Sequence, residues 1–163
     1  MGCQGEIYNI LGVEVDAEVY HKGQKLQQGQ FGFWPEEAEE EGGRDLVYKI
    51  NGRSFANDEG PEDVDGYNGV PTKYYGAIEK PEFIVNALGN SYAMGCRHFK
   101  GKALVGYPVA CEAYTSSAVP LPPTKQVEEW KPLLVKEIKE KLDIDVEESD
   151  LNLFLLFDFI NGW

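Results

Sequence analysis

Long apolar runs are absent from this chain of 163 residues. No stretch reaches the roughly 18 consecutive apolar residues that a membrane-spanning helix requires. The first residues lack the basic region and apolar run of a secretory signal. The three cysteines are an odd number without C-x-x-C spacing, which suits a compartment where thiols stay reduced. We therefore expect a cytoplasmic protein that does not bind membranes.

Motifs of catalysis and cofactor binding are absent too. Neither G-x-G-x-x-G nor G-x-x-x-x-G-K-[ST] occurs, so no glycine-rich loop to cradle a phosphate is predicted. G-x-S-x-G and H-E-x-x-H, which present a serine nucleophile or two zinc ligands, are also missing. We predict no cofactor, and these absences favour a protein that is not an enzyme. Because many sites are assembled from distant residues, an enzyme stays open as an alternative.

Basic residues are scarce relative to acidic ones. The chain has 15 Lys and Arg against 28 Asp and Glu, a formal net charge of −13. Residues 36–65 carry a net charge of −8 and residues 143–150 carry −5, so these two segments account for the whole excess. Such a field repels nucleic acid and anionic membranes and favours an oppositely charged partner. We therefore expect a basic protein partner and no direct nucleic-acid binding.

Apolar and alternating segments predict most of the chain to be strands. Asn51-Gly52 predicts a tight hairpin turn. Pro108 cannot donate to a ladder, so its strand is predicted to be an edge or to contain a bulge. The last predicted strand is apolar at nearly every position, which indicates a central strand covered on both faces. The predicted strands are residues 6–15, 45–50, 53–56, 74–78, 83–88, 103–115 and 151–160.

The clearest helix follows the proline-rich connector 116–123. Thr124 is its predicted cap, and Pro132 predicts either a kink or a short turn at 125–130 followed by a helix from 132 to 142. A second, less regular helix is predicted at 16–28. The apolar residues of the main helix share one face at helical spacing: Val127, Trp130, Leu134, Ile138 and Leu142.

These elements together predict an α+β fold. We expect a single mixed, largely antiparallel sheet of about five to seven strands, with one or two helices packed on one face. A chain of this length is close to the commonest domain size, so one domain over residues 1–163 is predicted. Residues 143–150 are expected to be the acidic loop that joins the helix to the last strand.

Candidate partner contacts come from an acidic run and a tyrosine pair. The five carboxylates within residues 36–41 repel one another and predict a solvated loop or short exposed helix. The tyrosine pair follows the long polar loop 57–72, and tyrosine is favoured at binding surfaces. The candidate partner-binding residues are Glu36, Glu37, Glu39, Glu40, Glu41, Tyr74 and Tyr75.

The loop 57–72 also holds the oxygen ligands that a hard cation such as Ca²⁺ prefers. The candidate metal ligands are Asp58, Glu59, Asp63 and Asp65. An EF-hand register fails, because with Gly66 at the sixth position Pro61 and Thr72 would occupy the first and last. A solvated acidic loop is therefore the preferred interpretation, ahead of a cation site.

Two smaller polar groups lie near or within apolar segments. Cys96, His98 and Cys111 are zinc-ligand or nucleophile types, but without paired spacing they are more simply a core thiol and loop residues. Asp158 is the one acid within the most apolar strand, where burial would raise its pKa. A position at the strand end or surface is the simpler interpretation for Asp158.

Three functions follow from this pattern. The preferred one is an interaction protein that engages a basic partner as an inhibitor, an adaptor or a nucleic-acid mimic. One alternative is an enzyme or small-molecule-binding domain that uses the 57–68 loop with a divalent cation, or Asp158 with nearby aromatic residues. The other is a structural subunit of an assembly.

Overall fold

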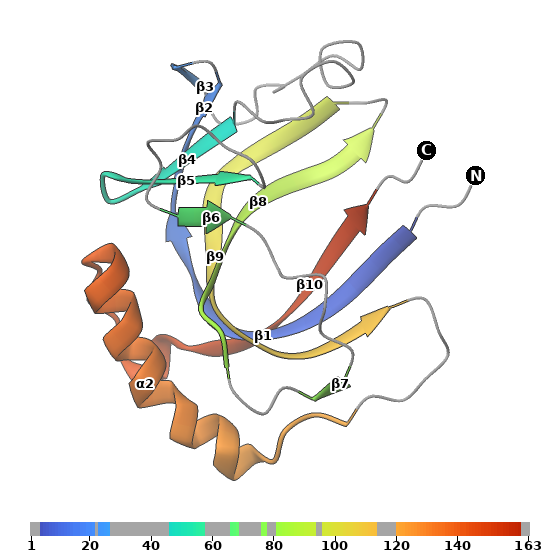
Figure 1. Cartoon of the computed structure of the whole chain (residues 1–163), viewed down its shortest axis with the longest axis vertical. Coiled ribbons are helices and arrows are strands. Elements are labelled where there is room, and N and C mark those ends of the chain that lie inside the picture. Colours follow the sequence, from blue (N-terminus) through green and yellow to red (C-terminus); the bar gives the residue numbers. More distant parts are fainter. Residues whose placement is uncertain are drawn as a thin grey trace. The chain divides into compact units, whose positions relative to one another are not determined.

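A computed structural model of the chain shows a mixed α+β protein in which strands predominate (Figure 1), so the predicted fold class is confirmed. The structure describes residues 4–21, 23–26, 46–57, 66–68, 76–77, 81–93, 96–113 and 120–160. The helices in these ranges are α2 (Thr124–Leu142) and the short 3-10 helix η1 (Glu148–Asp150). The strands are β1 (Gln4–Asp16), β2 (Glu18–His21), β3 (Gln24–Leu26), β4 (Leu46–Ile50), β5 (Arg53–Asn57), β6 (Gly66–Asn68), β7 (Gly76–Ala77), β8 (Ile84–Ala93), β9 (Cys96–Ala113) and β10 (Asn152–Ile160).

The chain divides into two compact units, and the long strands β1 and β9 contribute residues to both. Unit 1 comprises Met1–Val13, Val70–Ile84 and Gly106–Trp163, and unit 2 comprises Glu14–Gly69 and Val85–Val105. Each unit buries its own set of apolar side chains. A single domain over residues 1–163 stays a prediction.

The described strands form two sheets, so the prediction of a single sheet was wrong. One five-stranded sheet has the order β10-β1-β9-β7, with β8 also paired to β9; the other has the order β3-β2-β4-β5-β6. The described registers are antiparallel except for β5 with β6, which is parallel. Apolar alternation identifies a strand but does not identify its hydrogen-bonded neighbour, which is why the number of sheets was missed.

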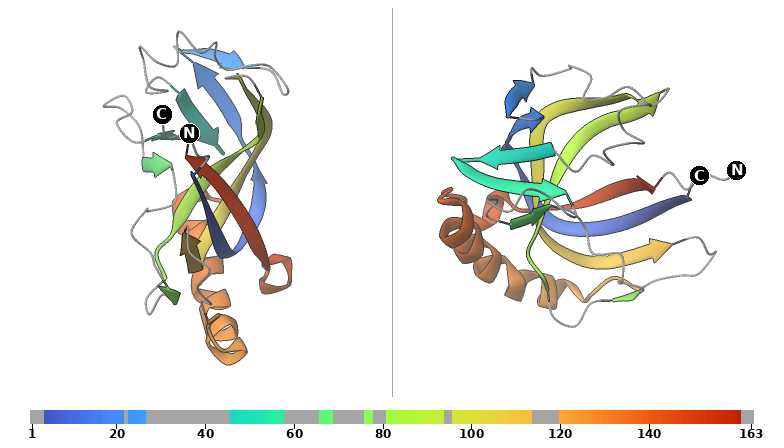
Figure 2. Two further views of the ribbon diagram at one scale, coloured as in Figure 1. Left: turned by 90° about the vertical axis from the view of Figure 1, so that its right-hand side faces the viewer. Right: turned by 45° about the horizontal axis from the view of Figure 1, so that its top comes forward.

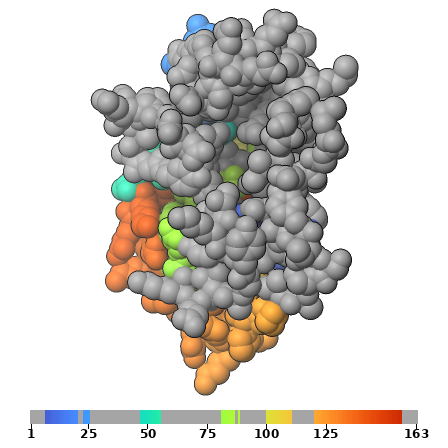
Figure 3. Space-filling model, turned by 45° about the vertical axis from the view of Figure 1, so that its right-hand side comes forward, coloured from blue at the N-terminus to red at the C-terminus, as the bar shows by residue number. Residues whose placement is uncertain are grey.

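The helix α2 packs against the rest of unit 1 through the apolar face that the sequence predicted. Val127, Trp130, Leu134, Ile138 and Leu142 are each 7% exposed or less, which confirms that face. Among the described residues, no helix is both long enough and apolar enough to cross a membrane. The space-filling view shows other atoms of α2 at the molecular surface (Figure 3), as expected for an amphipathic helix.

Pro132 lies inside α2, which continues through it as one helix of 19 residues. Of the two alternatives predicted at Pro132, the division into a turn and a shorter helix was therefore wrong, and the kink stays a prediction. Proline in a helix interior costs about 3 kcal/mol, whereas burying one large apolar side chain gains about 1.5–3 kcal/mol. The five buried residues on both sides of Pro132 offset that cost. The cap was also misplaced: Pro123 is the N-cap, and Thr124 is the first helical residue.

The last strand, β10, was predicted to be central, but it is an edge strand in the order of the described strands. It pairs with β1, and the two strands run side by side in the views of Figures 1 and 2. Leu153 and Leu155 are 51% and 61% exposed. The sequence correctly showed that β10 is apolar on both faces. The face that carries Leu153 and Leu155 is only partly buried.

The strand β9 was predicted to be an edge or to contain a bulge because of Pro108. It lies between β1 and the pair β7 and β8, so the edge position was wrong, and the bulge stays a prediction. Pro108 is fully buried. Its missing N–H does not interrupt the ladder to β7, whose described register involves Ala110 and Cys111. Gly106 explains how closely β9 approaches β1: a Cβ there would overlap the carbonyl oxygen of Leu11.

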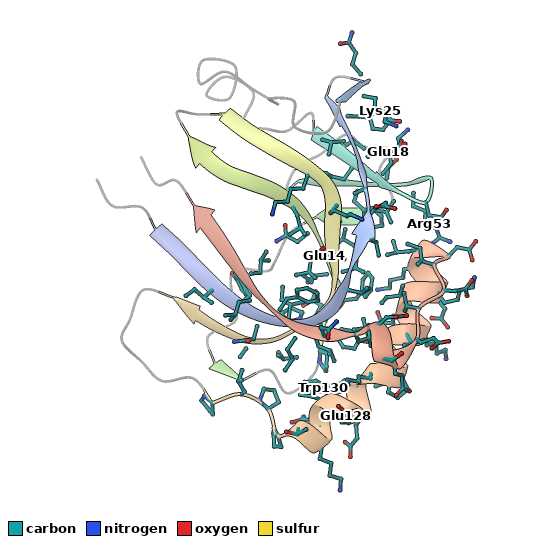
Figure 4. All side chains as sticks on the ribbon, turned by 180° about the vertical axis from the view of Figure 1, so that it is seen from behind. Glu14, Glu18, Lys25, Arg53, Glu128 and Trp130 are labelled. Carbon is teal, nitrogen blue, oxygen red and sulfur yellow. The ribbon has the colours of Figure 1, made fainter. Side chains whose placement is uncertain are left out.

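In unit 2, residues 16–28 contain β2 and β3 rather than the predicted helix. Glu18 is exposed and the next residue, Val19, is buried. This alternation of successive side chains is that of a strand and not of a helix. Gly23, with φ of 77°, lies between the two strands. Ion pairing supports the pairing of β2 and β3, because Lys25 Nζ lies 2.5 Å from Glu18 Oε1 (Figure 4).

The predicted hairpin between β4 and β5 is confirmed. Asn51 and Gly52 have φ of 49° and 81°, the left-handed backbone that a type I′ turn requires at both central positions. The register places Ile50 opposite Arg53 and Tyr48 opposite Phe55. Part of the predicted loop 57–72 is the strand β6, which pairs with β5.

Candidate functional site

The sequence-predicted contact residues and metal ligands lie outside the described residues. This holds for the partner-binding set Glu36, Glu37, Glu39, Glu40, Glu41, Tyr74 and Tyr75, and for the metal set Asp58, Glu59, Asp63 and Asp65. Within the described ranges, no group of three or more His, Cys, Asp and Glu side chains is arranged to hold a metal ion. The candidate site described below therefore belongs to another part of the chain.

The second acidic run, residues 143–150, is fully described and confirms the predicted connection between the helix and the last strand. We call it the acidic segment. Residues 143–147 form no helix or strand, the backbone is extended at Glu147, and η1 follows. Side chains alternate at first, with acids exposed and Ile144 and Val146 half-buried. All five carboxylates are exposed: Asp143, Asp145, Glu147, Glu148 and Asp150.

The start of the acidic segment is anchored to the end of α2. Asp143 takes the left-handed backbone conformation at φ of 52°, and its N–H donates to the carbonyl oxygen of Lys139 at 3.0 Å. Lys139 Nζ lies 2.8 Å from Asp143 Oδ1 and 3.2 Å from Asp145 Oδ1. Hydrogen bonds to Asp143 and then to Asp145 raise the pKa of Lys139 above its usual value. The lysine thus remains charged and neutralises part of the segment.

The end of the acidic segment is held by reciprocal hydrogen bonds around η1. The Glu147 N–H donates to Asp150 Oδ2 at 2.8 Å, and the Asp150 N–H donates to the Glu147 carbonyl oxygen at 3.0 Å. Asn152 Nδ2 donates to the Asp150 carbonyl oxygen at 3.3 Å. This capping box positions the carboxylates at the point where β10 begins.

Two exposed leucines follow the acidic segment directly. Leu153 and Leu155, which we call the apolar edge, are separated by one residue and therefore lie on one face of β10. In the register with β1, Leu153 is opposite the buried Leu11 and Leu155 is opposite Asn9. The apolar edge thus extends the buried layer of unit 1 outward to the surface.

A groove of about 400 Å³ lies beside Leu153, wholly within unit 1. Its polar rim includes an ion pair in which Lys131 Nζ lies 2.8 Å from Glu128 Oε1. Figure 4 labels Glu128 on the first half of α2. The groove is lined by Leu11, Val109, Leu121, Pro122, Thr124, Val127, Glu128, Lys131, Leu151, Asn152 and Leu153. Such a volume falls within the range that binds small ligands, about 300–1,000 Å³.

A hydrogen bond and an ion pair connect side chains of α2 with one another and with Tyr107 of β9, within unit 1. Tyr107 Oη donates to Glu137 Oε1 at 2.7 Å, and Lys141 Nζ lies 3.2 Å from Glu137 Oε2. Glu137 and Lys141 are four residues apart and therefore lie on the same side of α2. Lys141 Nζ also lies 4.7 Å from the centre of the Phe83 ring. Burial and then the hydrogen bond to Glu137 raise the pKa of Tyr107 well above its usual value.

Replacing Tyr107 with phenylalanine is expected to lower the free energy of unfolding by about 1–2 kcal/mol, because one hydrogen bond to a charged group is lost. The raised pKa keeps folded Tyr107 protonated where an unfolded tyrosine, with a pKa of about 10, ionises. The stability that Tyr107 adds is therefore full below about pH 10 and is lost as the pH rises further. Urea unfolding of both proteins at pH 8 and pH 11 would show a smaller difference at pH 11. An unchanged difference would contradict this coupling.

Other sequence-predicted polar groups are placed only by their backbone. Asp158 lies in β10 directly opposite Glu6 of β1. Cys96 and His98 lie in the first part of β9, and Cys111 lies near its end, opposite Gly76 of β7. His98 was expected in a polar loop, and its position in a strand corrects that expectation.

Sequence reasoning identified the charge of the acidic segment but missed the groove and the apolar edge. Charge is readable from composition, whereas the groove is assembled from four separate segments. The one signal for the groove in the sequence was Leu121, an apolar residue with prolines on both sides. Prolines disfavour a regular helix or strand there, so Leu121 is not buried within such an element.

Comparisons with known proteins give no family assignment. No protein-family model, no curated protein and no solved structure matches the chain.

Proposed function

We propose that this chain is a protein-interaction domain that binds a basic protein partner through the acidic segment and the apolar edge. The observation that supports this most strongly is the exposure of all five carboxylates of residues 143–150 directly before the exposed Leu153 and Leu155. Lys139 neutralises only part of this charge, because it contacts two of the five carboxylates.

The two parts of this surface contribute in different ways. Clustered carboxylates attract cationic ligands over a distance of about 8–10 Å at ordinary ionic strength and select against anionic ones. Exposed apolar side chains supply affinity when a partner removes them from water. A basic protein that also presents apolar side chains therefore fits this surface better than a purely basic one.

Neutralising two carboxylates tests the proposal. The double variant Asp145→Asn/Glu148→Gln is expected to bind a fluorescent lysine-rich peptide about three- to tenfold more weakly, since each exposed charge contributes up to about 1 kcal/mol. The matched control Glu14→Gln/Glu129→Gln removes the same charge from exposed positions elsewhere. Fluorescence anisotropy across a sodium chloride series measures both. Equal weakening in the two double variants, or binding that ignores salt, would refute the proposed surface.

The groove supports a second candidate, a small-molecule-binding domain. It combines apolar walls with a few polar groups, as small-ligand sites do. A native-state ligand raises the unfolding temperature, so a thermal-shift screen of metabolites should find stabilising compounds. Thr124→Trp would place an indole in the groove and should abolish that shift. A screen without any stabilising compound would remove this candidate.

A further inference from the structure

The first part of β10 lacks the features that usually protect an edge strand. Natural edges carry lysine, proline, inward-pointing charges or bulges, which prevent another strand from pairing. Residues 152–157 contain none of these residue types and no acid, and read Asn-Leu-Phe-Leu-Leu-Phe. Their leucines on one face, Leu153 and Leu155, are more than half exposed. This segment is therefore chemically suited to receive a further strand.

The hydrogen-bonding geometry points the same way. β10 pairs with β1 on one side and ends the order of the described strands on the other. In an antiparallel strand, alternate residues direct both N–H and C=O groups to each neighbour. Every second residue of β10 thus presents its backbone groups on the side away from β1. An added strand would satisfy them and set its own alternate side chains beside Leu153 and Leu155.

The groove extends the apolar surface at the beginning of β10. Leu153 belongs both to the apolar edge and to the lining of the groove, which it shares with Val127 of α2 and with Leu121 and Pro122. An apolar side chain of an added strand that lies over Leu153 could therefore enter the groove. Strand addition gains affinity from main-chain hydrogen bonds and specificity from pockets for alternate side chains.

Charge complementarity identifies the occupant. Leu151 alone separates the acidic segment from β10, so the end of an added strand beside Asn152 meets clustered carboxylates. A second copy of this chain in antiparallel orientation would bring residues 157–163 there, which contain Asp158 and no Lys or Arg. The occupant is therefore a different protein, with basic residues at that end.

We propose that β10 binds an extended segment of a partner protein as an added antiparallel strand, with apolar residues at alternate positions and Lys or Arg at its C-terminal end. The antiparallel direction follows from the antiparallel pairs of this sheet and from their greater stability. It places the C-terminal end of the segment beside the acidic segment. This inference rests on the proposed function and specifies its binding mode.

Peptides of one composition but different order test the binding mode. Against the full chain, anisotropy would compare Thr-Val-Thr-Val-Thr-Lys-Arg with Lys-Arg-Thr-Val-Thr-Val-Thr. The first is expected to bind at least about tenfold more tightly. Two further versions of the first peptide carry N-methyl groups on both valines or on both threonines that precede valine. Since alternate N–H groups face β10, one of these two versions should lose binding and the other should keep it.

A protein variant gives an independent measurement. Leu155→Lys places a protective lysine on the edge and should weaken the first peptide at least about tenfold. Leu133→Lys is the matched control, because Leu133 is 55% exposed and this substitution adds the same charge to the helix α2 instead of to β10. Thermal unfolding confirms that both variants fold.

The outcomes separate this inference from the proposed function. Salt-dependent binding of all peptides, without effect of order, N-methylation or Leu155→Lys, would overturn strand addition and leave the acidic docking surface in place. Absence of binding by every peptide at low salt would overturn both. Order dependence together with loss in one N-methylated version establishes the added strand.

Discussion

Gly106→Ala is expected to destabilise the protein by about 3 kcal/mol or more, because the added methyl group has no space between two strands. A Cβ at this position would overlap the carbonyl oxygen of Leu11 and lie 2.7 Å from Gly12 Cα. Both atoms belong to the backbone of β1, so no side-chain rotation relieves the overlap. Relief requires β1 and β9 to separate, which breaks ladder hydrogen bonds within unit 1.

Gly23→Ala is the control for this substitution. Gly23 has φ of 77° and nothing within 4 Å of an added Cβ, so its cost is left-handed backbone strain of about 1–2 kcal/mol. Urea unfolding followed by tryptophan fluorescence would measure both variants. If Gly106→Ala is no more destabilising than Gly23→Ala, β1 and β9 do not approach each other as described.

Leu134→Ala is expected to lower the free energy of unfolding by about 3–5 kcal/mol, since a fully buried leucine leaves a cavity in a packed core. Leu134 is 0% exposed and lies between Trp130 and Ile138 on the buried face of α2. The neighbouring Leu133 is 55% exposed. Leu133→Ala should therefore change stability by less than about 0.5 kcal/mol.

This pair of adjacent leucines separates burial from helix propensity. Both substitutions replace leucine with alanine in the same helix, so the intrinsic effect on helix formation is the same in each. Chemical denaturation gives the two free energies directly. Similar losses for Leu133→Ala and Leu134→Ala would show that α2 does not pack through its predicted face.

Local patterns predicted much of the secondary structure. The helical spacing of Val127 to Leu142 identified the buried face of α2, and Asn51-Gly52 identified the hairpin turn. These succeed because each depends on residues close together in the chain. Residues 16–28 were predicted as a helix because of a cap-like Asp16, but pairing with β4 outweighed that weak local signal.

The candidate site was predicted only in its charge. The acidic character of residues 143–150 is readable from the sequence, as is their place between α2 and β10. The exposed leucines beside these carboxylates were not predicted, because the sequence indicated that residues 151–160 form a central, buried strand. The other candidate residues, in 36–41 and 57–75, stay predictions.

The amino-acid sequence by itself determined the α+β class, most strand positions, the buried face of α2 and the two acidic concentrations. Composition, periodicity and turn chemistry are local, so they can be read without partners. Only the tertiary structure decided that the strands form two sheets, that β9 is interior despite Pro108 and that β10 is an edge. The physical reason is that a strand's neighbours are chosen by contacts between distant segments, and the same apolar run suits a central or an edge position.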